Sequence, residues 1–149
     1  MTREYPDNPL VGVGAVVVKD GRVLLIRRGQ EPLLGEWSLP GGALECGETL
    51  REATIREGRE ETGLVVETAE MLGVYERVVR DEDGRVRYHY VLIDFLCRAV
   101  AGELRAGSDA SEAQWFESDE FESLNLPGDT RDVISKGLRQ ESMKASESP

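Results

Sequence analysis

The sequence is poor in the residues that build disulfide frameworks and zinc sites. Its 149 residues include two cysteines, Cys46 and Cys97, and one histidine, His89. The cysteines show no Cys-x-x-Cys spacing, and a single histidine cannot form a histidine cluster. These scarcities argue against a disulfide scaffold and a zinc centre, and they favour a reducing, cytoplasmic location.

Long apolar runs and an excess of positive charge are also missing. The longest apolar stretch, residues 11–18, is interrupted by glycine, whereas a membrane-spanning helix needs about 20 consecutive apolar residues. Lysine and arginine total 18 against 29 aspartates and glutamates, which gives a formal net charge of −11. Since phosphate backbones and anionic lipids call for a basic surface, we expect neither a nucleic-acid polymer nor a membrane as partner.

The chain has instead the composition of one ordinary globular domain. Hydrophobic residues make up 40% of it, which is enough to form a core and too many for a disordered chain. We predict a frayed N-terminal arm at residues 1–9, a single domain at residues 10–140 and a disordered polar tail at residues 141–149.

The apolar pattern predicts several strands and two helices. Strands are expected at residues 11–19, 23–28, 37–39, 71–79, 87–100 and 113–117, and helices at residues 49–62 and 129–139. Asp20-Gly21 suits a type I′ hairpin turn between the first two strands. The strand at residues 87–100 is apolar on both faces, which is typical of a central strand covered on both sides. This order predicts the α/β (α+β) class, with an α/β/α sandwich around a mixed β-sheet.

Three glutamates lie on the apolar side of the first expected helix. Glu57 follows Leu50 by seven residues and Ala53 by four, Glu61 follows Glu57 by four, and Glu60 follows Glu57 by three. Residues at these spacings share one helix face. A solvated face with ion pairs is the ordinary interpretation of such a run. Carboxylates beside a sheet repel one another, however, and Mg²⁺ or Mn²⁺ with oxygen ligands would offset that repulsion.

The same segment carries a specific spacing of residue types. It reads Gly42-x5-Glu48-x7-Arg56-Glu57-x2-Glu60-Glu61-x-Gly63-Leu64. This spacing resembles the Nudix box. The resemblance continues over roughly residues 11–139, through the segments LLIRR, GEWSLPGG and YHYVLIDF and a later Trp115. It implies the Nudix fold and divalent-metal-dependent hydrolysis of a nucleoside diphosphate linked to another group.

Within that family, YHYVLIDF and DASEAQWF look most like ADP-ribose pyrophosphatases. The implied reaction converts ADP-ribose to AMP and ribose 5-phosphate. Two alternatives stay open: a nucleoside triphosphate pyrophosphatase that clears oxidised nucleotides such as 8-oxo-dGTP, and a catalytically silent nucleotide-binding regulatory module. A small-molecule nucleotide is the expected partner in each case, and the apolar strands permit a homodimer.

The resemblance also implies roles for individual residues. The catalytic group would comprise Glu57, Glu60, Glu61, Arg56 and Glu112. The metal ligands would be Glu57, Glu60 and Glu61 together with the backbone carbonyl of Gly41, and Glu48 would join Arg56 in holding the loop against the helix. Glu112 and Glu120 are the candidates for the additional carboxylate that the family often places beyond the box.

Residues outside the box supply weaker candidates. Arg27, Arg28 and Tyr88 are predicted to contact the substrate, because arginine binds phosphate in a bidentate manner and tyrosine stacks on bases. Solvated strand-end charge and core packing are the competing interpretations. Asp94 interrupts an apolar strand and should have a partner that the sequence does not name.

Gly58 departs from the family pattern, which usually has an aliphatic residue at that position. A glycine inside a helix lowers stability by about 1 kcal/mol relative to alanine. We expect Gly58 to leave a local void or to accommodate a bulky neighbour, without touching the metal ligands.

Overall fold

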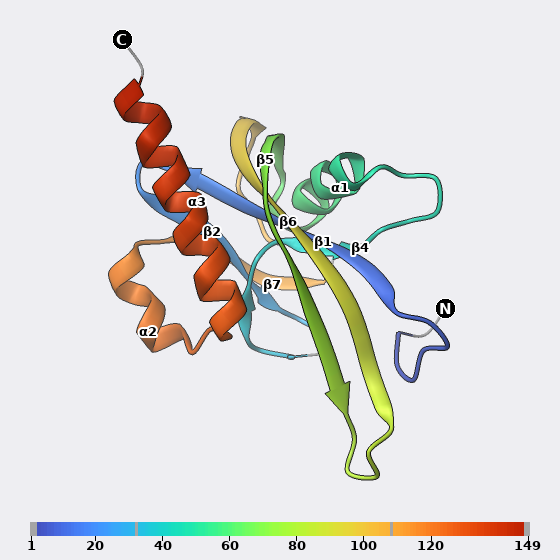
Figure 1. Ribbon diagram of the computed structural model, residues 1–149. Helices are drawn as coiled ribbons and strands as arrows, with labels where there is room; N and C mark the ends of the chain where they lie inside the picture. The colour runs from blue at the N-terminus through green and yellow to red at the C-terminus, as the bar shows by residue number, and fades with distance from the viewer. Residues whose placement is uncertain (1–2, 32, 108, 148–149) are drawn as a thin grey trace.

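The computed structural model describes residues 3–31, 33–107 and 109–147 (Figure 1). The strands are β1 (Leu10–Lys19), β2 (Arg22–Arg28), β3 (Trp37–Ser38), β4 (Gly41–Ala43), β5 (Leu64–Arg80), β6 (Val86–Gly102) and β7 (Ala110–Phe116). The helices are α1 (Leu50–Thr62), α2 (Phe121–Leu124) and α3 (Gly128–Glu147), with a 3-10 turn at Ser118–Glu120. In this part of the chain, no helix is both long and apolar enough to cross a membrane.

The strands form one mixed sheet in the order β3-β2-β1-β6-β5, with β4 paired to β1 and β7 paired to β2. β1 and β6 run parallel, and the other pairings are antiparallel. Figure 1 shows α1 and α3 on opposite sides of this sheet. The predicted sandwich around a mixed sheet is therefore confirmed.

Side chains along the central strands point alternately to the two faces of the sheet and so form two hydrophobic cores. On β1, Val16 and Val18 join the core under α3, whereas Ala15 and Val17 join the core under α1. β6 likewise contributes Leu96 to the first core and its intervening apolar residues to the second. A strand apolar on both faces thus has helices on both sides, as its pattern predicts.

Local signals determine both ends of α1 and the first hairpin. Thr49 caps the helix: its side chain accepts the Glu52 N–H, and the Glu52 side chain accepts the Thr49 N–H. Gly63 ends the helix with a left-handed φ of 76°. Asp20 and Gly21 also have positive φ, of 52° and 76°, as a type I′ turn requires.

The main differences from the sequence prediction concern β5, β4 and α3. β5 begins at Leu64, directly after the helix cap, and is longer than the predicted strand at residues 71–79. β4 was not expected, because Gly41–Ala43 carries no strand pattern and is ordered by pairing with β1. α3 continues to Glu147, so most of the predicted disordered tail is helical, and Lys144 there pairs with Glu70 of β5 at 2.7 Å.

The N-terminal arm is attached to the β5–β6 hairpin rather than frayed. The Tyr5 N–H donates to the carbonyl of Arg87 at 2.7 Å, and the Tyr5 hydroxyl donates to Asp81 at 2.9 Å. Glu4 pairs with Arg87 at 3.1 Å. Residues 1 and 2 of the predicted arm lie outside the described residues. These contacts hold the start of the chain, next to Arg3, beside the sheet.

Gly58 lies on the buried face of α1 with space beside it. A Cβ at this position would lie 3.7 Å from Val66 Cγ2, an ordinary van der Waals distance, with nothing else within 4 Å. We expect Gly58→Ala to raise the free energy of unfolding by about 1 kcal/mol, because alanine lowers the entropy of the unfolded chain without a clash. Urea denaturation measures this change.

Gly63→Ala is the matched control. Its φ is +76°, and a Cβ there would collide with the carbonyl of Glu103, so the same substitution should lower stability. A drop in stability for Gly58→Ala as well would contradict the idea of a local void.

Candidate active site

Two buried carboxylates lie at the C-terminal half of α1. Glu61 is 5% exposed and Glu57 is 9% exposed, as the shared helix face predicts. Glu61 Oε2 accepts the Gly41 N–H at 3.1 Å. Burial raises the pKa of Glu61 to about 8 despite that N–H, and burial also raises the pKa of Glu57. The protein therefore holds two carboxyl groups where ionisation is unfavourable without a nearby cation.

β4 approaches these carboxylates closely because it consists of small residues. A Cβ at Gly42 would lie 2.6 Å from both carboxylate oxygens of Glu57. At Gly41, a Cβ would collide with the backbone of Val13 on β1. Two glycines are thus needed here for the backbone to pass between the central strand and the helix.

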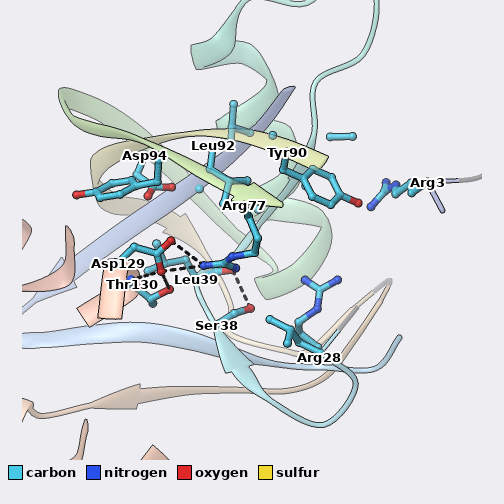
Figure 2. Close-up of a pocket in the computed structure, with 18 residues that line it drawn as sticks. Arg3, Arg28, Ser38, Leu39, Arg77, Tyr90, Leu92, Asp94, Asp129 and Thr130 are labelled. Carbon is cyan, nitrogen blue, oxygen red and sulfur yellow. Dashed lines mark hydrogen bonds and ion pairs between the residues drawn. The ribbon is translucent and has the colours of Figure 1, made fainter. Parts of the chain in front are cut away.

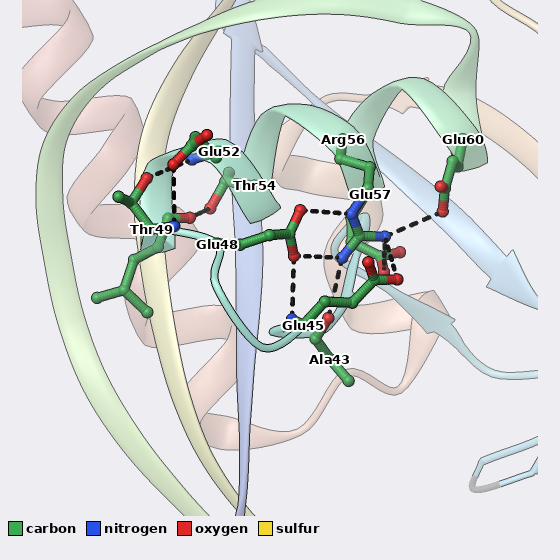
Figure 3. Close-up of polar contacts among 10 residues, drawn as sticks. Ala43, Glu45, Glu48, Thr49, Glu52, Thr54, Arg56, Glu57 and Glu60 are labelled. Atoms are coloured by element: carbon green, nitrogen blue, oxygen red, sulfur yellow. Dashed lines mark hydrogen bonds and ion pairs between the residues drawn. The ribbon is translucent and has the colours of Figure 1, made fainter. Parts of the chain in front are cut away.

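Arg56 joins the loop, β4 and α1 (Figure 3). Its guanidinium holds Glu48 with two hydrogen bonds, from Nε at 2.7 Å and from Nη2 at 2.9 Å. Nη2 also donates to the Ala43 carbonyl at 3.1 Å, and Nη1 donates to Glu57 at 2.8 Å and to Glu60 at 3.3 Å. Arg56 holds the pKa of Glu48 down at about 2, and its carboxylate partners raise the pKa of Arg56. The contact expected between Glu48 and Arg56 is present.

These groups line an acidic cavity. Its lining residues are Arg3, Ile26, Arg28, Gly41, Gly42, Glu45, Arg56, Glu57, Glu60, Glu61 and Asp109. Among the described residues, no three acidic, histidine or cysteine side chains converge as a ready metal-ion cluster. The reason is visible in the hydrogen bonds, since Glu57 and Glu60 face Arg56 while Glu61 faces the Gly41 N–H.

A largely apolar cavity adjoins the acidic one (Figure 2). Its lining comes from β1, β4, β5 and β6, from the ends of β2 and β3, and from the start of α3. Arg3, Arg28, Gly41 and Gly42 line both cavities. The arrangement places two guanidinium groups at the junction of an acidic and an apolar chamber, which suits a ligand with an anionic centre and an apolar end.

The structure brings some of the predicted residues together and separates others. Arg28 reaches both cavities, but Arg27 points to the opposite face, as alternation along β2 requires. Arg27 donates to the Gly35 carbonyl at 3.0 Å and pairs with Glu112 of β7 at 3.9 Å. Because the strand register fixes Arg27 opposite Glu112, neither of them lies at the described cavity walls.

Two further candidates also lie away from the cavities defined by the described residues. Tyr88 is 4% exposed and packs against the ring of Tyr90, and it is Tyr90 that lines the apolar cavity. Glu120 accepts the Glu117 N–H at 2.9 Å within the 3-10 turn. Instead, Asp109 in the loop before β7 lines the acidic cavity together with the glutamates of α1.

Sequence reasoning did not select several residues of the cavities. Arg3 belongs to the arm that was expected to fray, and Asp109 lies in a loop without a pattern. Arg77 of β5 forms a two-oxygen ion pair with Asp129 of α3, at 2.8 and 2.9 Å, across 52 residues of sequence. No local signal could reveal such a pair. Asp94 alone carried a signal, as a charge within an apolar strand.

Comparisons with known proteins agree with this geometry. A sequence model of the Nudix domain matches residues 8–136. An ADP-ribose pyrophosphatase of Methanocaldococcus jannaschii is 43% identical over 117 residues, or 78% of this chain and 67% of that protein. An 8-oxo-dGDP phosphatase of Mus musculus is 35% identical over 63% of this chain and 28% of that protein.

A solved structure shows the same likeness. The MutT Nudix hydrolase from Burkholderia pseudomallei superposes with a TM-score of 0.72 and 34% identity, covering 87% of this chain and 98% of that one. Since the domain match and the Methanocaldococcus jannaschii relative both cover most of the sequence, the chain belongs to the Nudix hydrolase family.

Proposed function

We propose that this Nudix hydrolase cleaves the pyrophosphate of ADP-ribose, with one water, to AMP and ribose 5-phosphate. The observation that carries the proposal is the junction of the two cavities, where Arg3 and Arg28 stand between buried carboxylates and an apolar chamber. A nucleoside diphosphate sugar has the matching parts, a central dianion and a flat apolar end. The 43% identity to an ADP-ribose pyrophosphatase supports the same choice of substrate.

The donor set of the acidic cavity fits Mg²⁺ or Mn²⁺. Glu57, Glu60, Glu61 and the Gly41 carbonyl would hold the ion through oxygen atoms, which are the ligands these cations prefer. When bound, the ion supplies charge neutralisation at the phosphates and a lower pKa for the attacking water. Burial has raised the pKa of Glu57 and Glu61, and a cation would offset the unfavourable ionisation of both.

The chain's own side chains have distinct parts in this proposal. Arg28 and Arg3 bind the diphosphate oxygens by charge-assisted hydrogen bonds. Arg56 positions Glu57 and Glu60 and keeps the loop at Glu48 against the helix. Asp109 supplies the further carboxylate of the acidic cavity, in the place for which Glu112 was the sequence candidate.

A homodimer and a cytoplasmic location stay predictions. The surface that a second copy would cover lies on the outer strand of the sheet. Val74 and Val78 of β5 are 55% and 45% exposed, and β5 stands at the end of the strand order. An exposed apolar edge of this kind favours pairing.

A product-resolved hydrolysis assay tests the proposed reaction. We expect AMP and ribose 5-phosphate from ADP-ribose with Mg²⁺ or Mn²⁺, and no turnover after the metal is removed with a chelator. Ordinary and 8-oxo nucleoside di- and triphosphates are assayed in parallel, because a relative acts as an 8-oxo-dGDP phosphatase. Faster release of a monophosphate from these compounds than from ADP-ribose would replace the proposed substrate. Metal-dependent binding without any product would support a silent regulatory module.

A further inference from the structure

A buried carboxylate on β6 faces the apolar cavity. Asp94 is 7% exposed and lines this cavity with Tyr75, Tyr90 and Leu92 (Figure 2). In the parallel register of β1 and β6 it stands beside Gly14. A Cβ at Gly14 would overlap Asp94 Oδ1, so the glycine provides the space that the carboxylate fills.

Asp94 differs from the other carboxylate of the cavity in having its acceptor capacity unused. Asp129 is occupied, because it accepts from Arg77 at 2.8 and 2.9 Å and from the Thr130 N–H at 2.8 Å. Asp94 accepts no hydrogen bond from the described residues. Every fully buried side-chain oxygen among those residues has a hydrogen-bond partner, so the oxygens of Asp94 must be accessible from the cavity. Without a donor from the protein, this acceptor can be satisfied only by water or by a ligand in the cavity.

Asp94 is an acceptor at neutral pH even though its surroundings raise its pKa. Burial and nearby Asp129 raise its pKa, Arg77 opposes both, and the net value is about 6. The group is thus ionised above pH 7. Among organic ligands, a carboxylate of this kind selects a group that donates N–H or O–H.

We propose that Asp94 is a specificity-determining residue that recognises the amino group of a nucleobase held in the apolar cavity. The tyrosine rings and Leu39 and Leu92 provide the apolar walls that suit a flat base, whereas a sugar would require several polar partners. With the base at Asp94, the phosphates extend past Arg28 and Arg3 to the acidic cavity. The inference rests on the proposed function for its substrate, adenine being the amino-bearing base of ADP-ribose.

Equilibrium binding of two nucleotides that differ by one amino group tests the inference. The probes are AMP and purine riboside 5′-monophosphate, which lacks the 6-amino group, measured by calorimetry at pH 7.5. We expect wild-type protein to bind AMP roughly 10- to 100-fold more tightly, the range for one hydrogen bond to a charged acceptor. Asp94→Leu should bring the affinity ratio close to one, and Asp94→Asn, with a neutral acceptor, should give an intermediate ratio.

Asp119→Leu is the matched control, because it removes an exposed carboxylate from the 3-10 turn and should leave the ratio unchanged. Equal wild-type affinity for the two nucleotides would overturn the inference without need of any variant. A preference for AMP that survives in both Asp94 variants would also overturn it.

The binding readout separates this inference from the proposed function. If the higher affinity for AMP depends on Asp94 but ADP-ribose is not hydrolysed, the proposed reaction fails and the base-recognition site stands. If ADP-ribose is hydrolysed as fast as its analogue without the amino group, the reaction stands and Asp94 is not the determinant.

Discussion

Replacing Glu57 or Glu61 by glutamine is expected to lower kcat for ADP-ribose hydrolysis by about 10³-fold or more. Each substitution keeps the side-chain shape and removes one negative oxygen ligand from the acidic cavity. Loss of several kcal/mol of charge stabilisation in the transition state corresponds to this factor, at tenfold per 1.4 kcal/mol. Steady-state kinetics with saturating Mg²⁺ measure the change. Glu76→Gln on the exposed face of β5 is the control and should leave kcat unchanged.

The Glu61→Gln variant should not lose stability, which distinguishes lost chemistry from misfolding. The pKa of Glu61 is about 8 in the folded protein and 4.5 when unperturbed, so the folded state retains a proton that the unfolded state has released. Stability of the metal-free wild type therefore falls as pH rises from about 4.5 to 8. Glu61→Gln has no proton to lose and should melt at or above the wild-type temperature at pH 8.5 in a chelator. Lower kcat together with a much lower melting temperature would contradict the assignment.

Replacing Arg56 by glutamine is expected to lower the free energy of unfolding by about 3 kcal/mol and to impair hydrolysis together with it. The guanidinium and its partners Glu48 and Glu57 are mostly buried, with side chains 23%, 18% and 12% exposed. Without the arginine, two carboxylates face each other across the loop without a counter-charge, and the Ala43 carbonyl loses its donor. Removing one member of such a network leaves unpaired charge, which is more damaging than removing an exposed pair.

Urea denaturation of two further arginine variants tests this explanation. Arg56→Lys keeps the charge but cannot hold Glu48 with two parallel hydrogen bonds, and it should recover only part of the stability. Arg59→Gln alters an exposed arginine one turn later on the same helix and should change stability by less than about 1 kcal/mol. Similar effects at Arg56 and Arg59 would show that helix charge in general, and not this network, is responsible.

The parts of the site that were predictable are those contained in one short segment. Thr49, Glu52 and Gly63 define α1 through contacts within three or four residues, and the spacing of Glu57 and Glu61 places both on the buried face. Glu48 and Arg56 lie close in sequence, so their contact was accessible as well. Helix geometry relates these positions without knowledge of the rest of the chain.

Other parts depended on registers and crossings between distant segments. Arg27 and Arg28 are equivalent in sequence, and only the orientation of β2 in the sheet directs Arg28 to the cavities and Arg27 to Glu112. Tyr88 and Tyr90 share one face of β6, and only the position of the cavity along the strand separates them. A shift of one residue along a strand reverses the face, so composition could not choose between Arg27 and Arg28.

The sequence by itself determined the family, the mixed sheet with helices on both faces, and the carboxylate helix with its arginine. Each follows from periodicities and spacings that act over a few residues. The tertiary structure decided which side chains complete the site. Arg3 arrives from the N-terminal arm through Tyr5, Asp109 arrives from the loop before β7, and Asp94 is placed beside Gly14 by the parallel pairing of β1 with β6. These positions result from long-range packing, which sums many weak contacts that no local pattern records.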